Sequence, residues 1–266
     1  MNILKKVLKS NRNIYRLSVF TYYLFRPLST WNVFLRLFRY LKYFKQLLKY
    51  MAMEQSEKIR ITNLRPCLDD WTKNTPVDSY YFYQDTWLAE KIFNSRPKQH
   101  VDVGSTALLV GILSKITNMI SIDIRPLPVT LKNLEFKEGS ILNMPFKNDE
   151  IFSLSSMCVI EHIGLGRYGD DLNPQGSQEA MNELTRVVGK NGNLYISVPL
   201  GEESVYFNAY RMFDVDKFVK GFKEFMLVDA LIITPDKQIT MNDYLKIARE
   251  EYADRMVVGC FHFKKR

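Results

Sequence analysis

Two short apolar runs, each carrying an aspartate, most constrain what this chain can fold into. His100–Ser105 contains a glycine turn, and Ser121–Ile124 follows about twenty residues later. The stretch between them, Ala107–Lys115, has the composition of a helix. Strand, glycine turn, helix, strand and acidic residue is the order of a nucleotide-binding βαβ unit. Gly104 is the single glycine in this turn, so the motif alone is a weak indication.

Strand and helix signals alternate along the rest of the chain. Further strands are expected at Ile151–Ile160, Asn193–Pro199, Phe225–Ile233 and Met256–Phe263, with a short segment leading into Gly139–Ile141. Helices are expected at Trp87–Asn94, Gly176–Val188 and about Met241–Tyr252. Alternating elements of this length predict an α/β fold with a mainly parallel sheet and right-handed crossovers.

The positive charge of the chain is concentrated at its N-terminal end. Residues 1–60 contain 13 lysines and arginines against two acidic residues, whereas the remainder contains 24 against 27. A nucleic-acid-binding core would carry its basic residues in the folded domain, so no nucleic-acid partner is expected. The three cysteines match no metal-binding or CxxC spacing, which favours a reducing cytoplasm.

Residues 1–50 are predicted to form a basic amphipathic helical extension. Between Trp31 and Tyr50, apolar residues recur every three or four positions, with basic residues on the other side. Such a helix can dock on an anionic membrane surface, or it can cap the main domain with its charges solvated. Charges interrupt every apolar run, so no transmembrane span is expected. The longest run, Leu17–Phe25, lacks a small-residue cleavage site, so no signal peptide is expected. Residues 51–77 are interpreted as a linker, and residues 78–266 as the main domain.

Five ordered blocks carry a family resemblance. They include Met144-Pro-Phe146, Ile151-Phe-Ser-Leu-Ser-Ser156, Val159-Ile-Glu-His-Ile163 and Glu183–Pro199. Together they resemble the class I S-adenosylmethionine-dependent methyltransferases that act on small molecules. Smaller pieces, such as Tyr81–Trp87 and Arg167-Tyr-Gly-Asp170, look like an uncharacterised branch associated with bacterial surface-polysaccharide genes. The resemblance implies a Rossmann-like methyltransferase fold, with a mainly parallel seven-stranded sheet, helices on both faces and an N-terminal helical extension.

The resemblance also implies a site for S-adenosyl-L-methionine. Asp102, Gly104 and Ser105 would lie at the first turn beside the methionine moiety. Asp123 would accept from both ribose hydroxyls and Ile124 would flank the adenine. The remaining expected cofactor contacts are Ser140, Ile141 and Met157. Ser105-Thr106-Ala107 replaces the usual glycine-rich continuation, and Ser153 stands where the family often has an aspartate.

Chemistry is expected at the carboxyl edge of the sheet, after the fourth strand. Methyl transfer to a hydroxyl needs an aligned nucleophile and a base, and His162 suits a base near neutral pH. Glu161 or Asp170 would orient it. The substrate is expected to contact residues of the following loops, which are Arg167, Tyr168, Asp171, Asn208, Tyr210 and Arg211. Because Asp170, Asp171 and His162 fit no ligand motif, no metal is assigned.

Three functional hypotheses follow from the sequence. The first is a cytoplasmic methyltransferase, peripheral at the inner face of the cell membrane, that modifies a hydroxyl of a sugar or glycan intermediate in surface-polysaccharide biosynthesis. The second is a nicotinamide-dependent sugar enzyme, which lacks support because no Tyr-x-x-x-Lys pair occurs and Gly164–Gly169 opens no predicted helix. The third is a non-catalytic scaffold that keeps the fold and docks partners of a glycan assembly complex through residues 1–50.

Overall fold

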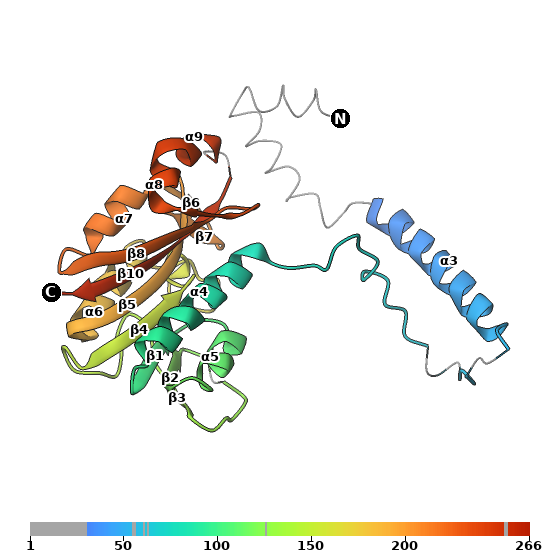
Figure 1. Cartoon of the computed structure of the whole chain (residues 1–266), viewed down its shortest axis with the longest axis horizontal. Coiled ribbons are helices and arrows are strands. Elements are labelled where there is room, and N and C mark those ends of the chain that lie inside the picture. Colours follow the sequence, from blue (N-terminus) through green and yellow to red (C-terminus); the bar gives the residue numbers. More distant parts are fainter. Residues whose placement is uncertain (1–30, 55–56, 61, 63, 126, 253–254) are drawn as a thin grey trace. The chain divides into compact units, whose positions relative to one another are not determined.

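A computed structural model gives the arrangement of the chain (Figure 1). It describes residues 31–54, 57–60, 62, 64–125, 127–252 and 255–266. The chain divides into two compact units, Met1–Pro76 and Val77–Arg266, which are considered separately below. The first thirty residues of the predicted N-terminal extension lie outside the described residues.

The described part of the first unit is built around helix α3, Trp31–Met51, which confirms the predicted N-terminal helix. Phe34, Leu41 and Leu48 are well exposed along it, with exposed fractions of 69%, 63% and 67%. On the basic side, Arg39 pairs with Asp69, and Nζ of Lys42 lies 3.4 Å from the ring centre of Trp71. Across the described ranges, no helix has both the length and the apolar character needed to cross a membrane.

The second unit contains a mixed sheet of eight strands in the order β3-β2-β1-β4-β5-β10-β8-β9. The first five pair in parallel, and β10 is antiparallel to both of its neighbours. The bounds are β1 Gln99–Val103, β2 Asn118–Asp123, β3 Leu134–Glu138, β4 Ile151–Met157, β5 Val188–Leu200, β8 Phe225–Ile233, β9 Gln238–Thr240 and β10 Val257–Lys265. The predicted fold class is therefore confirmed. The sheet has one strand more than expected because the short β9 adds to its edge.

Two hydrophobic cores cover the two faces of this sheet. Helices α4 (Ser79–Ser95) and α5 (Ala107–Leu113) pack on one face, around Leu88, Leu113 and Tyr195. Helices α6 (Gly176–Val187) and α7 (Val215–Gly221) pack on the other, around Leu184 and Phe218. Strand alternation sends successive side chains to opposite cores, so His100 and Asp102 of β1 share a face. This three-layer arrangement leaves the carboxyl ends of the parallel strands open at one edge.

Several elements differ in extent from the sequence prediction. Helix α4 begins at Ser79, not Trp87, because the Asp78 carboxylate accepts from the backbone N–H groups of Tyr80 and Tyr81. The aromatic stretch before Trp87 is thus part of the helix that packs on the sheet. Strand β5 begins at Val188, before the predicted Asn193, and β4 ends at Met157. The helix near the C-terminus is α8 (Met241–Asp243), the π-helical η4 (Tyr244–Ala248) and α9 (Arg249–Glu251).

Candidate functional site

The candidate site lies where β1, β2, β4 and β5 end at the same edge of the sheet. Parallel pairing places Val103 beside Ile122, and Met157 beside Ser197. A short 3-10 helix, η3 (Ile160–His162), continues from β4, and the hairpin β6 (Ser204–Tyr206) and β7 (Tyr210–Met212) follows β5. Ligands of open α/β sheets bind at this edge, so these segments bound the candidate site.

Gly104 forms the turn after β1 and has a backbone that favours glycine. Its φ is +74°, and its N–H donates to the carbonyl of Ile122 at 2.8 Å. A Cβ at this position would lie 2.8 Å from Cγ1 of Val159, which follows β4. The single glycine of the motif therefore serves two purposes, a left-handed turn and a close approach of two loops.

Asp102 is fully buried beneath this turn and is engaged by the protein itself. Its carboxylate accepts from the N–H of Ser105 at 3.2 Å and from Oγ of Ser105 at 2.7 Å, and Oγ of Ser155 donates to it as well. Burial raises the pKa of Asp102 to about 6. Asp102 therefore shapes the turn from inside instead of presenting free carboxylate oxygens to a ligand.

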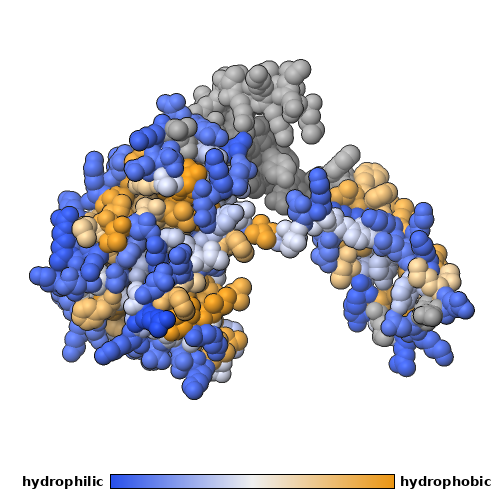
Figure 2. Space-filling view, viewed as in Figure 1, coloured by the Kyte–Doolittle hydropathy of each residue, from blue (hydrophilic) through white to orange (hydrophobic). Residues whose placement is uncertain are grey.

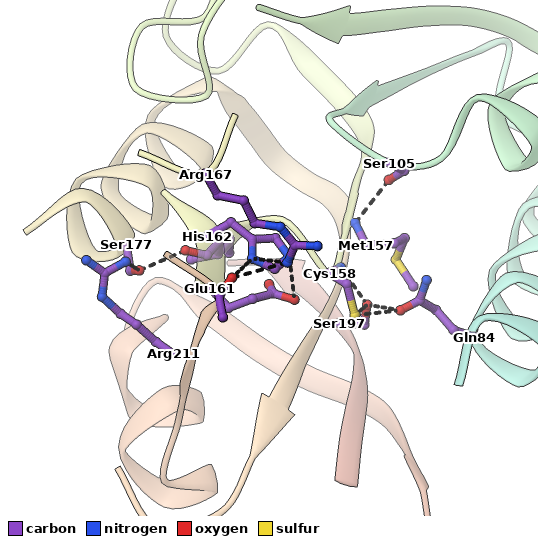
Figure 3. A network of polar contacts seen from close by, with 12 residues as sticks. Gln84, Ser105, Met157, Cys158, Glu161, His162, Arg167, Ser177, Ser197 and Arg211 are labelled. Carbon is purple, nitrogen blue, oxygen red and sulfur yellow. Dashed lines mark hydrogen bonds and ion pairs between the residues drawn. The ribbon is translucent and has the colours of Figure 1, made fainter. Parts of the chain in front are cut away.

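Ser105 is folded back into the same network. Its Oγ accepts from the N–H of Met157 at 3.1 Å, which ties the turn after β1 to the end of β4 (Figure 3). The sequence suggested that the missing glycines leave a bulkier turn. The structure shows the Ser105 hydroxyl turned inward, where it forms hydrogen bonds and leaves the outer side of the turn to the backbone.

Asp123 and Ile124 end β2 on the neighbouring strand. Oδ1 of Asp123 accepts from the N–H of Arg125 at 2.8 Å, and the guanidinium of Arg125 pairs with both carboxylate oxygens at 3.2 and 3.3 Å. Ile124 is 41% exposed beside it. A carboxylate next to an exposed apolar side chain suits a ribose and an adjoining flat ring. Ser140 is half-buried, and its Oγ accepts from the N–H of Leu142, whereas Ile141 is buried.

Glu161 and His162 follow β4 and contact each other in a buried position (Figure 3). Nε2 of His162 lies 3.7 Å from Oε1 of Glu161, and Nδ1 lies 2.6 Å from the carbonyl of Ala209. Because a carbonyl only accepts, Nδ1 carries the proton in this contact and Nε2 presents its lone pair. Burial lowers the pKa of His162 and raises the pKa of Glu161 to about 8. Oε2 of Glu161 is buried without a hydrogen-bond partner among the described residues.

A second buried cluster at this edge was not assigned from the sequence. Oε1 of Gln84 in α4 accepts from Oγ of Ser197 at 2.5 Å and from the thiol of Cys158 at 3.0 Å. Oγ of Ser197 accepts from the N–H of Cys158 at 2.9 Å. Cys158 has a φ of +53°, and burial raises its thiol pKa well above the ordinary value. The one signal in the sequence was the position of Gln84 just before the nucleotide-binding unit.

Asp170 organises its own loop, which differs from its expected role of orienting His162. Its carboxylate accepts from the N–H groups of Gly164 at 2.7 Å, Gly166 at 3.4 Å and Tyr168 at 3.2 Å. Burial acts to raise the pKa of Asp170, but these backbone hydrogen bonds together outweigh it and lower that pKa. The orienting contact to Nδ1 of His162 comes from the carbonyl of Ala209 instead. Asp171 is exposed in the same loop.

Arg211, expected to bind substrate, is buried and holds the same loop in place. Its guanidinium donates to the carbonyls of Ile163 at 2.5 Å and Asn173 at 3.3 Å, and to Oγ of Ser177 at 3.0 Å. These acceptors bracket the loop between η3 and α6, so Arg211 is a structural clamp. These bonds use three of its five N–H groups, and its contact with substrate stays a prediction.

The remaining predicted substrate residues lie at or near the open edge. Arg167 and Tyr168 are exposed, and the edge of the His162 ring faces Tyr168 with centroids 5.5 Å apart. Asn208 is exposed in the β6–β7 turn, and Tyr210 lies 4.9 Å from Tyr206, centroid to centroid. Within the described ranges, no group of three or more His, Cys, Asp and Glu side chains is placed to hold a metal ion.

These features allow a test of whether S-adenosyl-L-methionine fits the site. The glycine turn, Asp123 and Ile124 supply backbone, a carboxylate and an apolar face along one edge. Oε2 of Glu161 is a buried polar atom without a hydrogen-bond partner among the described residues at the same edge. Asp102 and Ile141 are interior residues that would support the site from below. The residues present therefore fit such a cofactor, with Asp123 and Ile124 as its outer contacts.

Comparisons with known proteins place the fold. A family profile described as a Caenorhabditis protein of unknown function, DUF268, matches residues 135–257. A comparison with curated proteins gave no match. Among solved structures, the [4+2]-cyclase SpnF superposes with a TM-score of 0.51 at 13% identity, covering 73% of this chain and 84% of the cyclase.

Two further structures are similar at lower scores. A Burkholderia thailandensis 1,6-didemethyltoxoflavin-N1-methyltransferase, with S-adenosylhomocysteine bound, gives a TM-score of 0.47 at 12% identity and coverages of 70% and 84%. A Streptomyces coelicolor A3(2) geranyl diphosphate C-methyltransferase gives 0.46 at 7%, with coverages of 68% and 78%. At these identities the likeness concerns the fold alone, and the reaction must be argued from the residues of this chain.

Proposed function

We propose that this protein is an S-adenosylmethionine-dependent methyltransferase that acts on a hydroxyl group. The observation that carries the proposal is the convergence of Gly104, Asp123 and His162 at one edge of the sheet, where β1, β2 and β4 end. The sequence blocks from Met144 to Pro199 support the same assignment, because they resemble this class in order and spacing.

His162 is the proposed general base. When bound, the cofactor supplies an electrophilic methyl group, and an acceptor hydroxyl must lose its proton as it takes that group. The contact of Nδ1 with the Ala209 carbonyl fixes the ring so that Nε2, which lies 3.7 Å from Oε1 of Glu161, presents its lone pair. Because burial lowers the pKa of His162, the imidazole is neutral at pH 7 and ready to receive a proton.

A sugar or glycan intermediate is the proposed acceptor class. The edge beyond His162 carries exposed Arg167, Tyr168 and Asn208, which supply charged, aromatic and amide groups suited to a polyhydroxylated molecule. The resemblance of the Tyr81–Trp87 and Arg167–Asp170 stretches to a branch associated with surface-polysaccharide genes supports this choice.

Calorimetric titration of the purified full chain with S-adenosylmethionine and S-adenosylhomocysteine tests the cofactor assignment. Binding by the wild type is expected, and Asp123→Asn is expected to weaken it at least tenfold. Asp149→Asn, at the opposite edge of the sheet, is the matched control and should bind normally. No binding by the wild type, or equal binding by Asp123→Asn, would contradict the cofactor site as drawn. Cofactor binding with no turnover on nucleotide-sugar and lipid-linked glycan acceptors would favour the scaffold hypothesis.

For helix α3, we propose docking on an anionic membrane surface. The helix has five basic residues and no acidic one, and its apolar side chains are exposed beside them (Figure 2). This pairing of cationic and apolar faces complements negatively charged lipid head groups above an acyl layer.

Sedimentation with lipid vesicles tests this docking. Binding to vesicles containing phosphatidylglycerol is expected, with much weaker binding to pure phosphatidylcholine and a decrease as salt rises. Leu41→Glu together with Phe44→Glu should abolish it, whereas Gln46→Ser on the same helix is the control. Equal binding by the double variant, or binding insensitive to both salt and lipid charge, would overturn the proposal.

A further inference from the structure

A chain of four buried polar side chains runs between β1 and β4 beneath the Gly104 turn. Nδ1 of His100 lies 2.7 Å from Oγ of Ser153, and Nε2 lies 2.9 Å from Oγ of Ser155. Oγ of Ser155 in turn donates to Oδ2 of Asp102. All four residues are buried, with 0% to 3% of their surfaces exposed. Neither His100 nor Ser155 was assigned a role from the sequence.

The direction of every hydrogen bond in this chain is fixed by counting protons. Burial lowers the pKa of His100 to about 3, so its ring is neutral and carries one N–H. The single proton of the Ser155 hydroxyl is donated to the Asp102 carboxylate, so Ser155 must accept from His100. The N–H is therefore at Nε2, and Nδ1 accepts from the hydroxyl of Ser153. One tautomer satisfies all the partners when Asp102 is ionised.

The chain ends at the turn of the proposed cofactor site. Asp102 receives the Ser155 hydroxyl on one side and the hydroxyl and N–H of Ser105 on the other. Ser105 also accepts from the N–H of Met157. A buried carboxylate left short of donors is costly, and its first response is to bind a proton. His100 donates to Ser155, so its loss would let the Ser155 hydroxyl turn away from Asp102. An Asp102 short of that donor would hold Ser105 less firmly.

We propose that His100 is a positioning residue of the cofactor turn, acting through Ser155 and Asp102 to hold Ser105 in place. The inference rests on the proposed function only in naming S-adenosylmethionine as the ligand of that turn. In this chain the hydrogen-bonded network fixes the conformation of the Gly104 turn, a role that additional glycines have in more open turns. Ser153 stands where an aspartate was expected from the family resemblance. Its neutral hydroxyl donates to Nδ1 of the neutral His100 ring.

The surroundings of the network favour a fixed neutral state. Tyr195 of β5 lies between His100 and His262 of β10, with ring centroids 6.2 and 4.6 Å away. Burial also lowers the pKa of His262, to about 4. Asp85 of α4 is the charged group that acts on Asp102 from the covering helix, and it raises the Asp102 pKa further. Below about pH 6, a proton on Asp102 would be donated to Ser155, Ser155 would donate to Nε2, and the ring proton would move to Nδ1.

Cofactor affinity of full-length variants tests the proposal. His100→Gln keeps an amide N–H near the position of Nε2, whereas His100→Leu removes it. We expect His100→Leu to lower affinity for S-adenosylmethionine tenfold or more, and His100→Gln to stay within threefold of the wild type. In a Ser105→Ala background, His100→Leu should cause no further loss, because its effect passes through Ser105. Equal losses for Gln and Leu, or additive losses with Ser105→Ala, would overturn the inference.

A second measurement keeps the inference separate from the proposed function and from any failure of His100→Leu to fold. Long-range ¹H–¹⁵N correlation spectra of the wild type should show a neutral His100 with its proton on Nε2 at pH 7.5. Hydrogen exchange should show a protected Ser105 amide in the wild type and His100→Gln. If no S-adenosylmethionine binds, the proposed function fails, but these spectra still test whether the hydrogen bonds of His100, Ser155, Asp102 and Ser105 exist as described. A proton on Nδ1 at pH 7.5, or a His100 that titrates near pH 6.5, would reject it.

Discussion

Glu161 is a carboxyl group that the fold holds away from water beside a histidine. Burial raises its pKa to about 8 from the ordinary 4.5, so the folded protein holds this proton more tightly than the unfolded chain. The stability that Glu161 contributes is thus fully present below about pH 4.5 and is lost as pH rises through about 8. Glu161→Gln removes that dependence. Relative to the wild type, this variant should gain on the order of 4 kcal/mol in unfolding free energy between pH 5 and 8.5.

Urea denaturation at the two pH values measures this difference. Glu250→Gln, at an exposed position in α9, is the control and should track the wild type at both. If Glu161→Gln and the wild type change in parallel with pH, Glu161 is not a buried acid that holds its proton.

His162 gives a prediction about activity. Burial is the main cause of its lowered pKa, so the neutral ring persists below the ordinary value of 6.5. Turnover should therefore be flat near pH 7 and fall on the acid side only below pH 6.5. His162→Gln should lower kcat roughly 10²-fold to 10⁴-fold with cofactor affinity unchanged, as expected for loss of a general base. A rate profile that still rises between pH 7 and 8 would exclude His162 as the group whose ionisation limits the reaction.

At the residue scale, the positions of the candidate residues were easier to predict than their contacts. Gly104, Asp123 and His162 were predictable because each follows a strand, and the ends of parallel strands meet at one edge. The contact of Ser197 with Gln84 was missed because it joins residues 113 positions apart and depends on how α4 packs on the sheet. The burial of Arg211 was not predicted for a similar reason, because it depends on the loop that this side chain clamps.

The glycine turn is the element that most constrains the site. Gly104→Ala would place a side chain at a φ of +74° and bring its Cβ to 2.8 Å from Val159. We expect a loss of about 2 kcal/mol in unfolding free energy, of which the backbone strain accounts for about 1 kcal/mol. In a Val159→Ala background, Gly104→Ala should lower the unfolding free energy only by the contribution of backbone strain, about 1 kcal/mol. Urea denaturation of the four proteins in this cycle measures the coupling, and a coupling of zero would place Val159 away from the turn.

The loop between η3 and α6 depends on Arg211 in a way that can be measured. Its guanidinium bridges the carbonyls of Ile163 and Asn173 and the hydroxyl of Ser177. Lysine is a single-point donor and cannot reproduce this fork. Arg211→Lys should therefore cost roughly 2 kcal/mol in stability and speed proteolytic cleavage between residues 164 and 175. Lys217→Arg, at an exposed position of α7, is the control. Equal cleavage rates for the wild type and Arg211→Lys would show that the loop does not need the Arg211 hydrogen bonds.

The elements themselves were predicted best where periodicity is strong. Helix α6 and strands β8 and β10 begin within one residue of the predicted positions, because their buried faces are continuous. The predicted start of α4, Trp87, was later than its true start, Ser79, because the capping role of Asp78 was overlooked among the aromatic residues that follow it. Strand β9 was missed because three residues, Gln238–Thr240, carry too little pattern to distinguish a strand from a loop.

At the scale of the whole molecule, charge and packing divide the chain at the same place. The net positive charge lies before residue 61, whereas the two hydrophobic cores lie within residues 77–266. A unit whose hydrophobic core lies entirely within it should fold without the other unit. From composition and the polar stretch of residues 51–77, the sequence predicts an extension over residues 1–50, a linker over residues 51–77 and a main domain over residues 78–266.

Removal of residues 1–76 should therefore separate the folding and cofactor binding of the second unit from the membrane binding of the first. The fragment 77–266 is expected to unfold cooperatively, with a Tm within a few degrees of the main transition of the full chain, because the cores that stabilise the sheet are intact. It should bind S-adenosylmethionine with unchanged affinity and lose binding to anionic vesicles. Calorimetry, titration and vesicle sedimentation on both proteins measure the three quantities. A fragment that loses its cooperative transition would show that the first unit completes the fold, and one that keeps vesicle binding would move the membrane contact from α3 to the sheet domain.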